Sequence, residues 1–324
     1  MDYSLNNKEF PFAPAPWLPQ YDLETLNKCR NIAREDMEYT NENGFSVKIV
    51  IDPTLHYVMD LIHRIYMSDV MDKKFTMICP NQWRPAYTAV ANMINMHNIN
   101  CRNVHAFAMD EFADQDGNVA PLTYGAGLGY NFLNCFYYRI REDLRPPIEQ
   151  WHVFTNENKG DGVYSKIIED VSEGGVDIIY SATGWPGHTA FIDPGAPEFA
   201  ADSLEEFITL DSRVTTCTPL TIVENSTFRC MGGSGDVWGT PPRAVTIGPK
   251  DVVTAKERLE LHNLVSGTGG ESWQRMISRI ELYGPITKEC PASILRLGKG
   301  TCYVSEILAR PFAGWTKDVK DWEL

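Results

Sequence analysis

The sequence predicts a single α/β domain, with a doubly wound, mainly parallel sheet and helices on both faces. Two observations carry this prediction. From Ser46 onward, short β-branched runs alternate with amphipathic stretches of helical period, a pattern typical of a parallel sheet covered on both sides. The chain has 324 residues and is 43% hydrophobic, which is enough to bury one large α/β core. We therefore expect an N-terminal extension over residues 1–45 and one α/β domain over residues 46–324.

The N-terminal extension begins with a proline-rich stretch. Pro11–Pro19 contains four prolines and two aromatic residues, and proline excludes a regular helix because it lacks the amide donor and fixes φ. We expect an extended arm that lies on a surface, either of its own domain or of a neighbouring subunit. Residues 21–39 then favour a helix that begins near Asp22.

The remaining elements follow from hydrophobic period. Parallel sheets of this kind bind ligands outside the carboxyl ends of their strands, so the loops that follow the strands are the candidate sites. The candidate strands are Val47–Ile51, Phe75–Cys79, Val104–Ala108, Val176–Ser181, Ala244–Ile247, Leu261–Val265 and Thr301–Val304. The clearest candidate helices are Leu55–Tyr66, Ala86–Met96 and Tyr164–Val171.

Two polar, glycine-rich stretches interrupt the alternation. Asp114–Gly129 has the composition of a mobile flap. Cys230–Pro242 is either a plain loop or an anion cradle, and no helix follows it to assist anion binding. Gly125–Gly129 lacks the strand-to-helix context of a dinucleotide-binding turn. We therefore expect no nucleotide cofactor.

Charge and cysteine content exclude several classes of protein. The net charge is −14 without a long basic run, which argues against a nucleic-acid or anionic-membrane partner. The eight cysteines form no CxxC pair, so reduced thiols in a cytoplasmic protein are expected. No signal peptide or membrane span is predicted. The histidines are scattered, and His188 has no second ligand at metal spacing, so no metal site is expected.

Asp110 and Glu111 follow directly after the buried run Val104–Met109. Two carboxylates at the end of a buried strand are costly to desolvate unless they are paired or used. Alternation along the strand allows only one of them to point into a cleft. The competing interpretation is a helix-capping Asp beside a solvated Glu.

A second strand-end loop carries an imidazole and a carboxylate. Gly184 and Gly187 permit a tight turn and close approach of a ligand. His188 and Asp193 are five residues apart, so they can form a pair that orients the ring and raises its basicity. The competing interpretation is a structural histidine, since most single histidines have no catalytic role.

Together these two segments resemble the glucosamine-6-phosphate deaminase/isomerase family, which shares its fold with the 6-phosphogluconolactonases. Asp110–Phe112 matches the family's Asp-Glu-Tyr, and Gly184–Pro194 matches its Gly-x-Asp-Gly-His-x-Ala-Phe-x-Glu-Pro loop. The matched segments occur in the family's order from about residue 46 to the end. Further similar segments are Asp211–Val214, Ala244–Gly248, Thr254–Glu257 and Pro291–Leu295.

The resemblance implies roles for these residues. Asp110 would take the C2 proton of a ring-opened amino sugar, and His188, held by Asp193, would assist ring opening. No cofactor is expected, and the resemblance and the proline-rich arm imply self-association as a homo-oligomer. We place in the substrate-binding region Glu111, Gly184, Gly187, Arg84, Arg213, Trp83 and Trp185. The two tryptophans are either platforms for a sugar ring or ordinary packing.

The chain also departs from the family pattern. Pro186 replaces a loop aspartate, and Asp193 replaces a longer glutamate. The phosphate-binding loop Pro-Thr-Gly-Gly-Thr-Pro is replaced by Pro80–Pro85, with Gln82 and Trp83 in place of the glycine pair. A family arginine aligns with Thr218 and a family lysine with Gly270. Each lost charge-assisted contact is worth roughly 1.5–3 kcal/mol, so the ligand need not carry the family's phosphate.

Three functions follow as hypotheses. The first is an isomerase or deaminase of carbohydrate metabolism that acts on a sugar or amino sugar, with Asp110 as base. The second is a sugar lactone hydrolase in which His188 activates water. The third is a catalytically silent protein that binds a sugar or sugar acid, which Pro186 and the altered phosphate loop favour.

Overall fold

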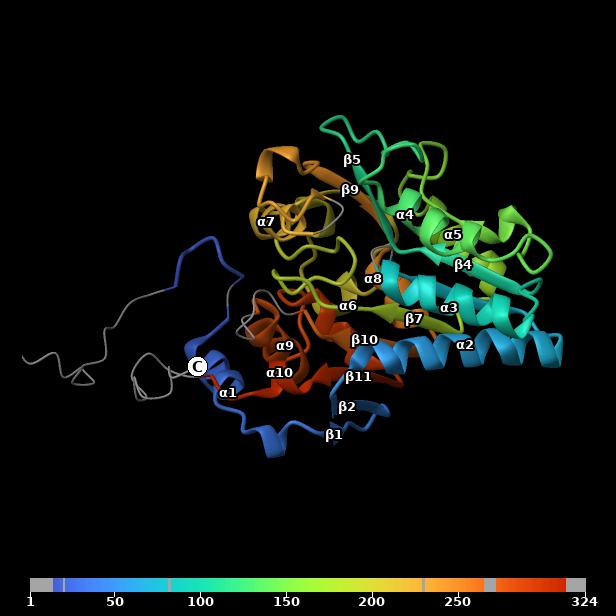
Figure 1. Ribbon diagram of the computed structural model, residues 1–324. Helices are drawn as coiled ribbons and strands as arrows, with labels where there is room; N and C mark the ends of the chain where they lie inside the picture. Colours follow the sequence, from blue (N-terminus) through green and yellow to red (C-terminus); the bar gives the residue numbers. More distant parts are fainter. Residues whose placement is uncertain (1–13, 20, 81–82, 229–230, 265–271, 313–324) are drawn as a thin grey trace, which may run out of the picture.

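The computed structural model describes residues 14–19, 21–80, 83–228, 231–264 and 272–312. These form a main sheet of eight strands in the order β1-β2-β11-β10-β7-β3-β4-β6 and a small sheet in the order β5-β9-β8 (Figure 1). All pairings in the main sheet are parallel except that of β1 with β2. The main strands are β1 (Tyr39–Thr40), β2 (Phe45–Val50), β3 (Phe75–Cys79), β4 (Val104–Ala108), β6 (Trp151–His152), β7 (Ile178–Ser181), β10 (Glu257–His262) and β11 (Gly300–Ser305). The antiparallel small sheet contains β5 (Asp110–Ala113), β8 (Arg213–Thr216) and β9 (Arg243–Thr246).

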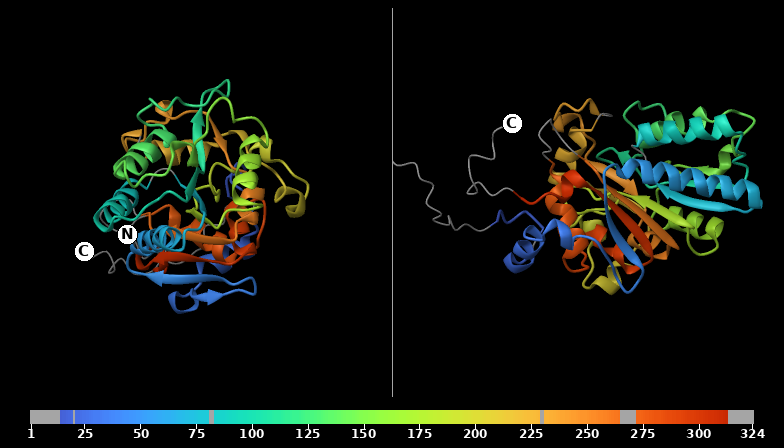
Figure 2. Two further views of the ribbon diagram at one scale, coloured as in Figure 1. Left: turned by 90° about the vertical axis from the view of Figure 1, so that its right-hand side faces the viewer. Right: turned by 60° about the horizontal axis from the view of Figure 1, so that its bottom comes forward.

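Helices cover both faces of the main sheet, as the sequence predicted (Figure 2). Alternation along the strands divides the core: Met77 and Cys79 of β3 face one apolar cluster, and Ile78 faces the other. The first cluster includes side chains of α2, α3 and α4, and the second includes side chains of α5, α8, α9 and α10. The helices are α1 (Leu23–Arg30), α2 (Pro53–Met71), α3 (Arg84–His97), α4 (Leu128–Cys135), α5 (Val163–Ser172), α6 (Leu204–Phe207), α7 (Pro219–Ser226), α8 (Pro249–Thr254), α9 (Gln274–Tyr283) and α10 (Glu306–Ala309).

Most predicted elements are present, with three shifts. The strand expected at Leu261–Val265 runs instead from Glu257 to His262, and Val265 lies outside the described residues. The helix expected over 21–39 ends at Arg30 and is followed by a short 3-10 helix; its start is capped by the Asp22 carboxylate, which accepts a hydrogen bond from Thr25 N at 2.7 Å. The strand expected at Ala244–Ile247 belongs to the small antiparallel sheet.

The described part of the N-terminal extension lies against its own chain. Helix α1 packs on α9 through a cluster that includes Cys29, Ile277 and Ile280. Residues 14–19 border two cavities whose other walls include Pro186 and Leu220. Residues 1–13 of the predicted arm lie outside the described residues.

Two further expectations concern loops and membranes. Within Asp114–Gly129 the chain folds back so that Ala113 pairs with Val119, and α4 begins at Leu128. Cys230–Pro242 contains a short 3-10 helix at Val237–Gly239, and Cys230 lies outside the described residues.

Among the described helices, none combines the length and apolar character needed to cross a membrane.

Candidate active site

A cavity of about 460 Å³ opens where the predicted topology places a ligand. It lies at the carboxyl ends of four adjacent main-sheet strands, β10, β7, β3 and β4. Each strand contributes the residues that follow it. The wall includes Pro80 after β3, Met109 and Asp110 after β4, Ala182, Thr183 and Gly184 after β7, and Asn263 and Leu264 after β10.

The two predicted catalytic loops meet at this cavity. Asp110 and His188 both line it, and each is at least nine-tenths buried. Asp193 lies behind the imidazole and is hydrogen-bonded to His188 Nδ1 through its Oδ1 atom. The other Asp193 oxygen accepts a hydrogen bond from Thr218 N at 2.7 Å. The shorter aspartate therefore reaches the ring, and the backbone at the start of α7 holds it there.

A carboxylate that the sequence analysis did not identify faces the other ring nitrogen. Glu224 on α7 is buried, and its Oε2 atom lies 3.6 Å from His188 Nε2. The same oxygen accepts a hydrogen bond from Trp185 N at 2.8 Å. Pro186 supplies no carboxylate to this loop, and Glu224 brings one from a helix instead. Its position in an ordinary amphipathic stretch gave no signal in the sequence.

These carboxylates set the protonation of the imidazole. Burial works against the charged ring, but Asp193 and Glu224 outweigh it and raise the pKa of His188 to about 9. Burial raises the pKa of Glu224 to about 7, although the positive charge of His188 opposes this shift. His188 is therefore suited to donate a proton near neutral pH, while Asp110 is the carboxylate on the cavity wall beside it.

The glycines of the loop have different functions. A Cβ atom on Gly184 would lie 2.0 Å from His188 Nε2 and 2.8 Å from Glu224 Oε2. Only glycine therefore allows this strand end to pass beside the imidazole. Gly187 has a φ of 91°, which a residue with a side chain adopts only at a cost. A Cβ at Gly187 would meet Cys290 and Ile277, and the residue does not line the cavity.

Three other predicted binding residues also lie elsewhere. Glu111 points away from the cavity and accepts hydrogen bonds from Leu128 N and Gly129 N at 2.9 and 2.6 Å, so it caps α4. The alternation of adjacent strand residues accounts for this. Arg213 donates to the carbonyl oxygens of Asp211 and Glu198 and lies over the Phe199 ring. Trp185 stacks on Trp273 at a ring distance of 5.7 Å, beside the N-terminal arm.

Arg84 and Trp83 do line the cavity. Arg84 is the first residue of α3, and the Trp83 ring packs edge-on against Tyr57 at 4.8 Å. Arg84 is the only lysine or arginine that the described part of the chain contributes to the cavity wall. Gln82 and Gly270, at two positions where the family's phosphate contacts are altered, lie outside the described residues.

The fold and this cavity define a class: an α/β domain of the type shared by glucosamine-6-phosphate deaminases and 6-phosphogluconolactonases. A structure of a monomeric glucosamine-6-phosphate deaminase superposes with a TM-score of 0.61 at 17% identity, covering 81% of this chain and 98% of that one. A 6-phosphogluconolactonase from Thermotoga maritima gives 0.53 at 14% identity, covering 81% and 100%. These likenesses establish the fold.

The relatives found by sequence are glucosamine-6-phosphate deaminases, whereas the similar structures also include lactonases. The chain is 29% identical over 199 residues to the glucosamine-6-phosphate deaminase of Phocaeicola vulgatus, covering 59% of this chain and 66% of the relative. It is 27% identical to the enzyme of the same name from Fusobacterium nucleatum, covering 58% and 62%. The chain thus spans slightly less than two thirds of these relatives' length. No family model matches. The predicted resemblance is confirmed, and the chain is a divergent relative of enzymes of this name.

Proposed function

We propose that the protein is an enzyme of carbohydrate metabolism that moves a proton at C2 of a sugar or amino sugar. Asp110 is the base that takes the proton, and His188 protonates the ring oxygen as the sugar opens. The observation that carries the proposal is that Asp110 and a carboxylate-held imidazole line one buried cavity at the strand ends. The relatives' name, glucosamine-6-phosphate deaminase, supports an amino sugar as substrate.

The charges in the cavity support a division of labour between acid and base. The imidazole lies between Asp193 and Glu224, so its protonated form is favoured and it can act as the acid. Asp110, a carboxylate on the cavity wall, is then the base. An enediol-type intermediate would then form in the cavity.

Phosphate recognition is a separate part of the proposal. Arg84 is the cation available at the cavity wall within the described residues, and it begins a helix of 14 residues. We propose that Arg84 binds the anionic group of the substrate, whether a phosphate or a carboxylate. An Arg84→Gln variant should raise KM for an anionic sugar at least about tenfold and leave the uncharged sugar unaffected.

Hydrolysis of a sugar lactone is the second candidate, supported by the 6-phosphogluconolactonase fold. A water-activating histidine must be neutral, whereas burial against two carboxylates raises the pKa of His188 to about 9. Near neutral pH the imidazole would therefore be mostly protonated and a poor base. This favours the isomerase or deaminase reaction over the lactonase reaction.

The test is proton exchange at C2. Wild-type protein is incubated in deuterated buffer with glucosamine 6-phosphate or with unphosphorylated glucosamine, both of which carry a proton at C2, and exchange, ammonia and ketose are followed. We expect exchange with at least one of them, and an Asp110→Asn variant should lose about 10²–10⁴-fold in rate. Asp170→Asn, which changes an exposed helix residue paired with Lys166, is the matched control. Full activity in Asp110→Asn would exclude Asp110 as the base, and ligand stabilisation without exchange would favour a sugar-binding protein.

A further inference from the structure

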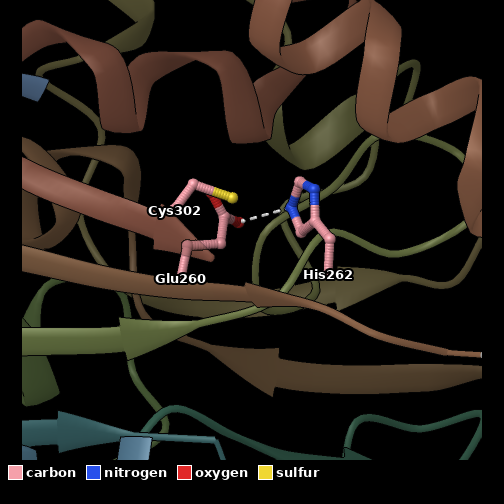
Figure 3. Close-up of side chains that lie close together, drawn as sticks. All are labelled: Glu260, His262 and Cys302. Carbon is pink, nitrogen blue, oxygen red and sulfur yellow. Dashed lines mark ion pairs between the residues drawn. The ribbon is translucent and has the colours of Figure 1, made fainter. Parts of the chain in front are cut away.

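A second cluster of ionisable side chains lies beneath the main sheet, on the face covered by α9. Glu260 and His262 are two residues apart on β10, so both point to the same face. Cys302 of β11 is paired in register with Glu260, and Glu281 reaches the cluster from α9. All four side chains have no exposed surface. Figure 3 shows Glu260, His262 and Cys302 directed toward one another.

The polar atoms of this cluster lack ordinary partners within the described part of the chain. Five buried polar atoms have no hydrogen-bond partner there: both carboxylate oxygens of Glu260, both of Glu281 and the Nε2 atom of His262. A buried carboxylate without a partner is costly, and two of them side by side repel. A single imidazole cannot satisfy four carboxylate oxygens, so the cluster calls for a further positive charge.

The separations fit metal ligands better than hydrogen bonds. His262 Nε2 lies 3.5 Å from a Glu260 oxygen and 3.3 Å from a Glu281 oxygen, which is longer than an ordinary N–H···O bond. In a tetrahedral site with bonds of roughly 2.0–2.1 Å, neighbouring ligand atoms are about 3.3–3.4 Å apart. The ligand atoms of Glu260, His262 and Cys302 all lie within 4.8 Å of one another, so small movements of these side chains would bring all three to one ion.

The imidazole is also oriented for coordination. His262 Nδ1 lies 2.7 Å from the Ser278 hydroxyl, which leaves Nε2 directed at the carboxylates. Ser278 is one turn before Glu281 on α9, so the same helix supplies a ligand and the group that holds another ligand in place. A hydrogen bond on the second ring nitrogen is the usual support of a metal-bound histidine.

We propose that Glu260, His262, Glu281 and Cys302 bind a divalent transition-metal ion, with Zn²⁺ the ion that these donors favour. A sulfur and an imidazole select Zn²⁺ over Mg²⁺ or Ca²⁺, which prefer oxygen ligands. Binding replaces the thiol proton, which passes to solvent as the sulfur–metal bond forms. With four buried protein ligands the site is closed, so its role is structural. The site has no local pattern in the sequence, because its ligands come together only through the pairing of β10 with β11 and the packing of α9.

The ion would stabilise the candidate active site from below. Asn263 and Leu264, which line the catalytic cavity, directly follow His262. Leu264 N donates to the side chain of Gln274, which in turn donates to Thr183 O. A metal that joins β10 to β11 and α9 fixes the strand end from which these residues project.

The first experiment measures the metal content of the full-length protein after dialysis against a chelator. We expect about one equivalent of zinc per chain, and replacement by Co²⁺ should give the thiolate-to-cobalt absorption band that Cys302 ligation requires. His262→Asn and Cys302→Ser should lose the metal and melt several degrees lower. Cys101→Ser, which removes another buried free thiol, should keep both metal and band.

The competing explanation is that Glu260 and Glu281 share a proton beside the imidazole. In that case folded wild-type protein, grown and tested with added zinc, would contain less than a tenth of an equivalent and give no cobalt band. That result overturns the proposal even if the variants fail to fold. These measurements do not depend on any substrate, so they are independent of the outcome for C2 proton exchange.

Discussion

Glu224 controls the protonation of His188 from the Nε2 side. At 3.6 Å a full negative charge in a partly polar interior changes the pKa of a neighbouring group by about one to three units. Glu224→Gln should therefore lower the pKa of His188 by at least about one unit, measured by NMR titration of labelled imidazoles. Glu198→Gln removes a carboxylate paired with Arg243 instead and should leave His188 unchanged. An unchanged His188 pKa in Glu224→Gln would show that Asp193 alone sets it.

Gly184 is a steric requirement of the same site. In Gly184→Ala the new methyl group would meet His188 Nε2 at 2.0 Å, so the ring must move away from Asp193 or Glu224. We expect at least about a hundredfold loss of C2 exchange, with a stability cost of about 1–3 kcal/mol. The matched control is Gly125→Ala, where a Cβ has no neighbour within 4 Å. Equal activity in the two variants would contradict the assigned geometry.

At this scale the sequence predicted the residues with a local signature. Asp110, His188 and Asp193 stand in strand-end loops, and strand polarity is enough to bring those loops together. Glu224, which lies 31 residues beyond Asp193, is buried beside the imidazole only because α7 folds over the cavity. Arg213, which the sequence analysis placed in the binding region, does not line the cavity and donates to the carbonyl oxygens of Asp211 and Glu198.

At the scale of elements, Glu111 caps α4. The helix has no side-chain cap at Gly127, and the Glu111 carboxylate accepts from the backbone amides of Leu128 and Gly129. The carboxylate also accepts from Phe112 N at 2.8 Å, so its removal leaves three backbone donors unsatisfied. Glu111→Ala should therefore lower the free energy of unfolding by about 2–4 kcal/mol in urea titration. Glu157→Ala, at an exposed position, should cost less than about 0.5 kcal/mol.

A second variant at this position separates the two interpretations of Glu111, as a helix cap and as a substrate contact. Glu111→Gln keeps one acceptor oxygen and should fold with a smaller loss of stability than Glu111→Ala. If Glu111 only caps the helix, KM for the substrate found by C2 exchange should change less than about twofold in Glu111→Gln. A rise of tenfold or more at unchanged stability would restore the original assignment as a binding residue.

The bounds of strands made of apolar residues throughout could be predicted from the sequence, whereas the bounds of a strand with buried polar residues could not. Phe75–Cys79 and Val104–Ala108 were predicted to the residue because parallel strands buried on both faces are nearly continuous apolar runs. Strand β10 was displaced in the prediction because Glu260 and His262 interrupt its apolar pattern. Those same two residues form the proposed metal site, so the sequence rule failed where the core carries polar groups.

At the scale of the whole molecule, the arrangement of layers followed from the strand–helix alternation, but the second sheet did not. Strand β5 follows β4 with a single residue between them and then pairs with β9 rather than extending the main sheet. Strand β5 and helix α7 contribute Asp110, Glu224 and Asn225 to the cavity wall, and Figure 1 shows β5, β9 and α7 in the upper part of the molecule. Their placement depends on long-range packing, to which hydrophobic period is insensitive.

The buried ionisable groups predict that the whole molecule is less stable in alkaline solution. Burial raises the pKa of Glu111 and of Glu224 to about 7 and that of Asp251 to about 6. Against the opposing effect of burial, neighbouring carboxylates raise the pKa of His188 to about 9. Each of the three acids contributes to the free energy of unfolding because it holds its proton more tightly in the folded protein. This contribution is fully present below the unfolded pKa of roughly 4 and is lost as pH rises through the folded pKa. For His188, the contribution is complete below roughly 6.5 and is lost as pH rises through about 9.

Between pH 5 and 9 these groups all lower the free energy of unfolding as the pH rises, because the folded state binds more protons than the unfolded state. A raised carboxyl pKa of this size corresponds to about 3 kcal/mol between its two limits, and the coupled pair Glu224 and His188 contributes less than the sum. We expect Tm and the free energy of unfolding to fall steadily from about pH 6 to pH 9, measured by calorimetry and urea titration. Comparison of wild type with single variants identifies the groups responsible. Glu111→Gln should flatten the dependence of the free energy of unfolding on pH mainly below pH 7. Glu224→Gln should flatten it over the wider range that Glu224 shares with His188. A wild-type stability that stays level or rises over this interval would mean that these groups are ionised in the folded protein at little cost, and the acid–base assignment of the cavity would have to be reversed.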